Sequence, residues 1–267
     1  MKGFDIIILA GQSNAEGSGT GRVYKKFSPD GKIFELVDAN REKVVLSEQG
    51  WLSLIKPYEY VVQEAREIVK ENKPYGNLAH GFAEEYIRAG KLEEDRCLLI
   101  VKAAIGGTGF ARKHWGKDDE LPKRMYDMID YALGLEGDNR IVAFLWHQGE
   151  HDSVENSEFS LELRGKYYFE KFNCLISETL KRYGQMPVIA AGFTEEWSKD
   201  YVKECAAVIK AIKKVLALYG GGFVTTRGLK SNNEDSGNGD TIHFCRSALY
   251  KLGKRYFNKF IDITKVK

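Results

Sequence analysis

Short apolar segments recur along the chain, and polar turns separate them. Several are almost continuously apolar rather than alternating, which is typical of strands that are covered on both faces of a sheet. The pattern predicts five such strands, at Phe4–Ala10, Cys97–Ile105, Ile141–Trp146, Val188–Phe193 and Phe223–Thr226. Each run is too short to cross a bilayer, so we expect no contact with a membrane.

Segments with the apolar spacing of amphipathic helices lie between these runs. The spacing predicts helices at roughly Ala79–Ala89, Pro122–Leu133, Glu158–Tyr183, Tyr201–Leu218 and Arg246–Phe260. Strands that alternate with helices indicate a parallel sheet with helices on both sides. The fold class is therefore predicted to be α/β, a three-layer α/β/α sandwich around a mostly parallel sheet of about five strands.

The stretch between residues 19 and 75 is less regular and is expected to decorate the rim of the sheet. Within it only Val61–Lys70 has helical spacing, which predicts one short helix. No internal repeat, low-complexity tract or linker rich in Pro, Gly or Ser divides the chain. We therefore expect a single domain over residues 1–267.

Residues suited to chemistry follow the ends of several predicted strands. "GQSN" (residues 11–14) follows the first strand, "IGGTG" (105–109) the second and "HQGE" (147–150) the third. The pair Asp240 and His243 stands just before the last predicted helix. Because the carboxyl ends of parallel strands meet at one edge of a sheet, we expect these segments to converge there.

Together these residue types supply what an acyl-transfer site needs. Ser13 would be the nucleophile, with His243 as the base that takes its proton and Asp240 as the carboxylate that orients the imidazole. The tetrahedral intermediate carries an oxyanion that requires donors aimed at it in advance. The backbone N–H groups of Ser13 and Gly107 and the side-chain amide of Gln148 are the candidate donors.

Charge, cysteine content and the remaining motifs narrow the class of protein. A formal net charge of +2 over 267 residues gives no reason to expect a nucleic-acid partner. The four cysteines lie far apart without a C-x-x-C pair, which predicts free, mostly buried thiols in a reducing compartment. The N-terminus lacks a signal-peptide cleavage pattern, so we expect a cytoplasmic protein, with a trimmed mature form of a secreted protein as the alternative. No dinucleotide or phosphate-loop motif follows a strand, and we expect no cofactor and no metal.

The motifs at the strand ends resemble those of the SGNH-type hydrolases, in the branch of sialate O-acetylesterases and acetylxylan esterases. The resemblance rests on "LAGQSNAEG" (residues 9–17), "IGGTGF" with the following Trp115, "WHQGEHDS" (146–153) and "DTIHF" (240–244). It implies a Ser–His–Asp triad of Ser13, His243 and Asp240, and an oxyanion hole of three donors. It also implies an acetylated carbohydrate as substrate, either xylo-oligosaccharides or sialic acids.

Two departures from the family pattern concern the pocket. Gln148 stands where the wider superfamily has asparagine, and Ala15-Glu16 replaces the Met-Ala of many members. Residues expected to support the triad or line the pocket are Gln12, Asn14, Gly106, Thr108, Glu150 and Trp115. Glu150 is also a minor candidate for the acid behind His243, and Trp51, Trp115 and Trp197 could either stack on a sugar or pack in the core.

Two other functions remain open at this stage. His147 and His151 stand in an H-x-x-E-H pattern that is found in zinc hydrolases, although Gly149 and the preceding strand disfavour the helix that this pattern needs. The chain could also be a non-catalytic carbohydrate-binding protein on the same scaffold, but an intact Ser13, Asp240 and His243 argue against that. The sequence leaves the oligomeric state open.

Overall fold

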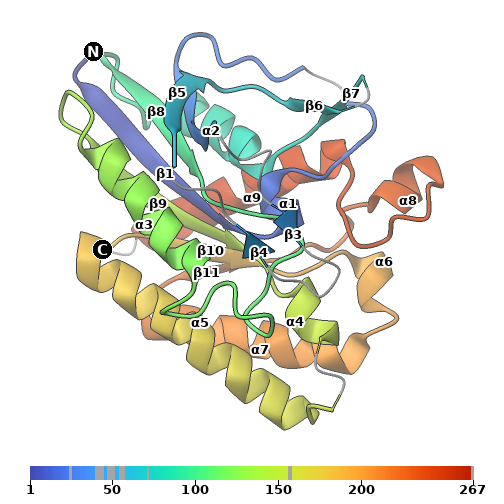
Figure 1. Ribbon diagram of the computed structural model, residues 1–267. Coiled ribbons are helices and arrows are strands. Elements are labelled where there is room, and N and C mark those ends of the chain that lie inside the picture. Colours follow the sequence, from blue (N-terminus) through green and yellow to red (C-terminus); the bar gives the residue numbers. More distant parts are fainter. Residues whose placement is uncertain are drawn as a thin grey trace.

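A seven-stranded sheet forms the centre of the molecule (Figure 1). The computed structural model describes residues 1–23, 26–39, 45–46, 52–53, 58–70, 72–155 and 158–265, and all structural statements below concern these residues. The strands of the sheet, in spatial order, are β11 (Gly222–Val224), β10 (Val188–Ala191), β9 (Arg140–His147), β1 (Gly3–Gly11), β8 (Arg96–Lys102), β2 (Ile33–Asp38) and β5 (Tyr60–Glu64). Neighbouring strands run parallel except β5, which pairs antiparallel with β2 at the edge.

Five long helices cover the two faces of this sheet. They are α2 (Leu78–Arg88), α3 (Glu120–Leu133), α5 (Leu161–Tyr183), α7 (Val202–Leu218) and α9 (Arg246–Thr264). The described part of the chain also has four short helices: α1 (Ser13–Glu16), α4 (Glu150–Val154), α6 (Glu195–Ser198) and α8 (Asn232–Ser236). Two small hairpins, β3 (Val45–Leu46) with β4 (Leu52–Ser53) and β6 (Ile68–Lys70) with β7 (Lys73–Tyr75), lie outside the main sheet.

The central strand β1 shows how the two cores form. Its side chains alternate between the faces, so that Ile6 and Ile8 pack with α3, α5 and α7 while Ile7 and Leu9 pack with α2 and α9. All four are fully buried, and each buried side chain of this size contributes about 1.5–3 kcal/mol to folding. Burial on both faces explains why this run is apolar without alternation. The predicted three-layer α/β/α sandwich is confirmed.

The prediction for residues 19–75 was wrong in part. The five predicted strands are present, but β2 and β5 extend the sheet to seven. Val61–Lys70 is not a helix, because its first half belongs to β5 and its second half to β6. The register pairs Val37 with Val61 and Leu36 with Val62, so this strand is stabilised by a partner distant in the chain.

Other expectations about the chain concern its cysteines and its helices. All four cysteines are free; Cys97, Cys205 and Cys245 are buried and Cys174 is half-buried, as predicted. Among the described helices, none combines the length and apolarity that crossing a bilayer requires.

On the right in Figure 1, α1, α4, α6 and α8 lie along the edge where the parallel strands end.

Candidate active site

Ser13, His243 and Asp240 form one hydrogen-bonded line at the carboxyl edge of the sheet. Ser13 Oγ lies 2.8 Å from His243 Nε2, and His243 Nδ1 lies 2.9 Å from Asp240 Oδ2. An ionised Asp240 only accepts hydrogen bonds, so Nδ1 carries the proton and Nε2 is left to accept the Ser13 hydroxyl hydrogen. The geometry therefore has a hydroxyl, a base and an orienting carboxylate in the order that nucleophilic catalysis requires.

Asp240 is held in its ionised form by its surroundings. Burial acts to raise the pKa of its carboxyl group, but hydrogen bonds from His243 and Asn232 outweigh this, and the pKa lies below its usual value. Asn232 Nδ2 donates to Asp240 Oδ2 at 2.8 Å, and the backbone N–H of Asn232 donates to the carbonyl of His243. Asn232, in α8, was not identified from the sequence. It fixes both members of the pair.

A tight strand end places Ser13. β1 and β9 run together up to Gly11, where a Cβ would lie 2.1 Å from the carbonyl oxygen of His147, so only glycine fits. Its φ of 133° is also one that other residues rarely adopt. The N–H of Gln12 then donates to the same carbonyl at 3.0 Å, and Ser13 opens α1. Ser13 is thus held at the rim of a strand that is buried along its whole length.

The glycine turn after β8 passes beside the serine. A Cβ on Gly106 would lie 3.4 Å from Ser13 Cβ. The N–H of Gly106 donates to the carboxylate of Glu16, whereas in the described part of the chain neither the Gly107 nor the Ser13 N–H has a protein acceptor. Gly107 has a φ of 74°, which turns its peptide group away from the strand direction. Two backbone N–H groups without an acceptor among the described residues thus stand at Ser13 and in the glycine turn.

Gln148 lies beneath this turn and is 1% exposed. Its Oε1 accepts from Tyr168 at 3.0 Å, which fixes the orientation of the amide. Its Nε2 lies 3.1 Å from Gln12 Oε1, 2.5 Å from Asp152 Oδ2 and 3.4 Å from the carbonyl oxygen of Thr108. Both amide hydrogens thus have protein acceptors, which the sequence did not reveal.

Asp152 is a further residue that sequence reasoning missed, although it stands in the "WHQGEHDS" motif. Its carboxylate accepts from Gln148 and from the backbone N–H groups of Phe110 and Ala111, at 3.1 and 2.8 Å. Burial raises the pKa of Asp152 to about 6, although these hydrogen bonds act to lower it. The side chain joins the segment after β9 to the end of the glycine turn. Its place in the same short motif, four residues after Gln148, is the signal that could have found it.

Glu150 and Asn14 lie together, apart from the imidazole of His243. Glu150 Oε1 accepts from Asn14 Nδ2 at 2.8 Å, and both side chains are fully buried. Asp240, and not Glu150, is the carboxylate that the structure places against His243 Nδ1. Burial acts to raise the pKa of Glu150, but contacts with His147 and Asn14 outweigh this and lower it.

The remaining pocket candidates are mostly internal. Thr108 Oγ1 donates to the carbonyl of Ile105 and accepts from Trp115 Nε1, so both side chains lock the glycine turn from inside. Trp115 is fully buried and Trp197 is 7% exposed, which leaves neither a free ring face for a sugar. Trp51 lies outside the described residues.

The two histidines of the zinc pattern face different partners. His147 ends β9, with Nδ1 3.1 Å from the hydroxyl of Tyr256 and Nε2 3.6 Å from Glu150 Oε1. His151 lies in α4, with Nδ1 3.3 Å from Gln12 Nε2. Among the described residues, no group of three His, Cys, Asp or Glu side chains is arranged to hold a metal ion.

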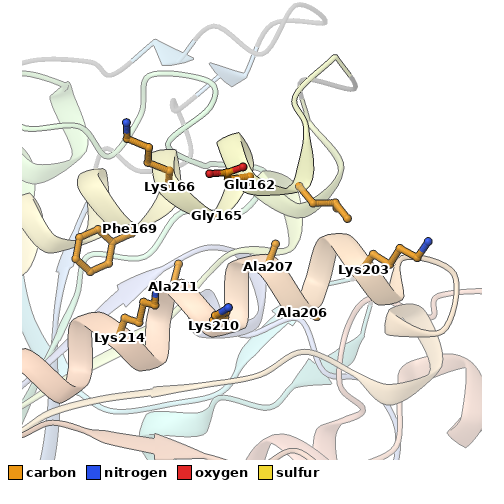
Figure 2. A pocket seen from close by; sticks show the side chains of 11 residues that line it. Glu162, Gly165, Lys166, Phe169, Lys203, Ala206, Ala207, Lys210, Ala211 and Lys214 are labelled. Carbon is orange, nitrogen blue, oxygen red and sulfur yellow. The ribbon is translucent and has the colours of Figure 1, made fainter.

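A groove of about 570 Å³ lies elsewhere, between α5 and α7 (Figure 2). Its floor includes the small residues Gly165, Ala207 and Ala211, and four lysines line it: Lys166, Lys203, Lys210 and Lys214. Among the described residues that line this groove there is no serine and no histidine, so the groove lacks the groups of a serine-esterase site.

Three solved structures illustrate the likeness of the fold. NanS is 17% identical with a TM-score of 0.71, and the match covers 100% of this chain and 99% of that chain. A protein from Arabidopsis thaliana is 19% identical with a TM-score of 0.65, covering 97% and 98%. A mutant of Axe2, an acetyl-xylooligosaccharide esterase from Geobacillus, is 12% identical with a TM-score of 0.50, covering 97% and 96%. At these identities the likeness establishes the fold alone.

Sequence comparison gives the family. No curated protein sequence matches the chain. The family model described as "Carbohydrate esterase, sialic acid-specific acetylesterase" matches residues 3–262, nearly the whole chain. Its match spans all four motifs noted in the sequence, including the segments that carry Ser13 and His243. The chain therefore belongs to the sialic acid-specific acetylesterase family of carbohydrate esterases, and it is a carboxylic ester hydrolase.

Proposed function

We propose that the protein is a serine esterase that removes O-acetyl groups from carbohydrates through an acetyl-enzyme on Ser13. The observation that carries the proposal is the line from Ser13 Oγ through His243 to Asp240, with separations of 2.8 and 2.9 Å. These distances are within hydrogen-bond reach, as a nucleophile and its base must be.

The reaction has two steps, acylation and deacylation, and in each step His243 gives back the proton that it takes. His243 Nε2 takes the Ser13 proton while Oγ attacks the acetyl carbonyl carbon, and the imidazolium then returns this proton to the departing sugar oxygen. In the second half His243 takes a proton from water, the hydroxyl oxygen attacks the acetyl-Ser13 carbon, and Ser13 Oγ leaves with the proton. Acetate is released, and Asp240 stabilises the imidazolium in both halves.

The oxyanion is proposed to bind the N–H groups of Ser13 and Gly107, which have no protein acceptor in the described part of the chain. Gln148 Nε2 is the proposed third donor. Because both of its amide hydrogens already have acceptors, this role requires Gln148 to exchange its contact with Gln12 for one with the oxyanion.

The family match supports acetylated sialic acids as the first substrate class. Acetylated xylo-oligosaccharides are the second class, supported by the likeness of the fold to Axe2, an acetyl-xylooligosaccharide esterase. We expect acetate release from at least one of the two when each is supplied to the purified protein. A serine-directed phosphonate should label Ser13 and stop the reaction. Inhibition by a chelator without labelling of Ser13 would instead support the zinc alternative on His147 and His151. If the phosphonate does not label Ser13 and the chelator has no effect, the result would support a non-catalytic carbohydrate-binding protein.

The pH dependence tests the assignment of the base. His243 must be neutral to accept the Ser13 proton, so the rate should fall about tenfold per pH unit once the imidazole is protonated. Asp240 does not produce this decline, because its lowered pKa keeps it ionised until the pH falls below the usual carboxyl range. We expect kcat/KM on p-nitrophenyl acetate to fall on acidification while Asp240 is still ionised. A rate that stays flat down to about pH 4, where carboxyl groups titrate, would indicate a carboxylate base.

A further inference from the structure

The base stands on a segment that has no regular structure of its own. His243 lies between α8 and α9, and its side chain is 26% exposed. A residue in such a loop keeps its position only through contacts that fix its backbone. Asn232 N–H donates to the carbonyl of His243 at 2.8 Å, which holds one side of this segment.

The other side of the segment is held by Asn14, the residue next to the nucleophile. Its Nδ2 donates to the carbonyl of Ile242 at 3.2 Å, and its Oδ1 accepts from the N–H of Phe244 at 3.0 Å. One fully buried side chain thus binds the peptide groups on both sides of His243. Because Asn14 follows Ser13 directly, the same residue ties the base to the strand end that carries the hydroxyl.

A buried charged group determines how the Asn14 amide is turned. Glu150 Oε1 accepts from Nδ2 at 2.8 Å, and an ionised carboxylate can only accept, so it selects the NH₂ end of the amide. Phe244 N–H can only donate, so it selects the carbonyl end. Tyr256 gives its hydroxyl hydrogen to the carbonyl of Trp146, which leaves its oxygen to accept from His147 Nδ1. His147 Nε2 then faces Glu150.

We propose that Asn14, oriented by Glu150, is a positioning residue: it holds the His243 imidazole at hydrogen-bonding distance from Ser13 Oγ. This proposal rests on the proposed serine mechanism and assigns a role within it that neither the triad nor the oxyanion hole supplies. A misplacement of about 1 Å in a reacting group can cost about 100-fold in rate. Loss of the Asn14 contacts should therefore act on kcat more than on substrate binding.

The test compares Asn14 with a matched amide at the other end of the sheet. Asn139 also joins two backbone segments. Its Oδ1 accepts from Phe4 N–H at 2.8 Å, and its Nδ2 donates to the carbonyl of Leu135 at 2.6 Å. We expect Asn14→Ala to lower kcat on p-nitrophenyl acetate by about 10–100-fold, with KM within about twofold and slower phosphonate labelling of Ser13. Asn139→Ala should lower the melting temperature and leave kcat near that of the wild type.

The outcomes separate this proposal from the serine mechanism itself. If the wild type hydrolyses the ester and Ser13→Ala does not, but Asn14→Ala keeps its kcat within about threefold, the positioning role is wrong while the mechanism stands. If Ser13→Ala is as active as the wild type, the mechanism fails first. Asn14→Asp decides the matter if Asn14→Ala does not fold: it keeps the size of the side chain but, facing Glu150, can donate at most one hydrogen where the amide donates two, and it should also lower kcat at least about tenfold.

Discussion

Replacing Ser13 by alanine is expected to lower kcat for acetyl-ester hydrolysis by about 10⁴-fold or more, because the acyl group then has no oxygen to receive it. The residual rate would come from water attacking an ester bound at the remaining oxyanion donors. Stability should barely change, since the hydroxyl is half-buried at the rim and its described side-chain contact is with His243. Initial rates and thermal melts on the same preparation measure both quantities.

Ser160→Ala provides a matched serine control for this experiment. Ser160 caps the start of α5, where its hydroxyl accepts from the N–H of Leu163 at 3.1 Å. Loss of such a cap costs about 0.5–2 kcal/mol, so this variant should melt earlier with kcat intact. A Ser13→Ala protein that retained a rate within about tenfold of the wild type would remove Ser13 from the chemistry.

Replacing Gln148 by alanine is expected to lower kcat by about 100-fold with little change in KM, because a donor to the developing oxyanion acts mainly in the transition state. The variant should also melt earlier. Asp152 Oδ2 and Gln12 Oε1 would each lose one of their donors, and Tyr168 would lose an acceptor inside a buried network. Gln148→Glu should be at least as impaired, since a carboxylate there repels both the oxyanion and Asp152.

The melting temperature and kcat together distinguish an oxyanion donor from a purely structural amide. Tyr168→Phe is the companion variant, because it removes the hydrogen bond to Gln148 Oε1 and leaves the Asp152 and Gln12 acceptors of Nε2 unchanged. It should lose stability with a much smaller effect on kcat than Gln148→Ala. A Gln148→Ala protein that is less stable yet as fast as the wild type would show that the amide only supports the glycine turn.

Much of the fold was predictable because its central strands are buried on both faces. The run Phe4–Ala10 can be read as a strand without knowledge of its partners, and the helices carry clear apolar stripes. Val61–Lys70 could not be read in this way. Its apolar positions suit a helix as well as two short strands, and β5 forms through pairing with β2, which no local pattern records.

The candidate site was predictable at the level of residue types and not at the level of hydrogen-bond partners. Strand ends that meet at one edge bring Ser13, Gly107 and Gln148 together, so their convergence follows from topology. The Asp240–His243 pair follows α8 and not a strand, and its residue types alone marked it as a candidate. Which acceptor each amide finds depends on side-chain packing across the layers. That is why the contact of Asn14 with the residues beside His243, and the hold of Asp152 on Gln148, appear only in three dimensions.

The nucleophile and its base come from opposite ends of the chain, 230 residues apart. Ser13 follows the first strand, which lies between β8 and β9, and His243 precedes the last helix, which packs against α2. Contacts between such distant segments form late, because the intervening chain must first be ordered. A chain still emerging from the ribosome would thus hold its serine without an imidazole and could not hydrolyse esters. During refolding, esterase activity would return only once the segment that carries His243 has docked. The rate of its return would therefore measure the rate of that docking.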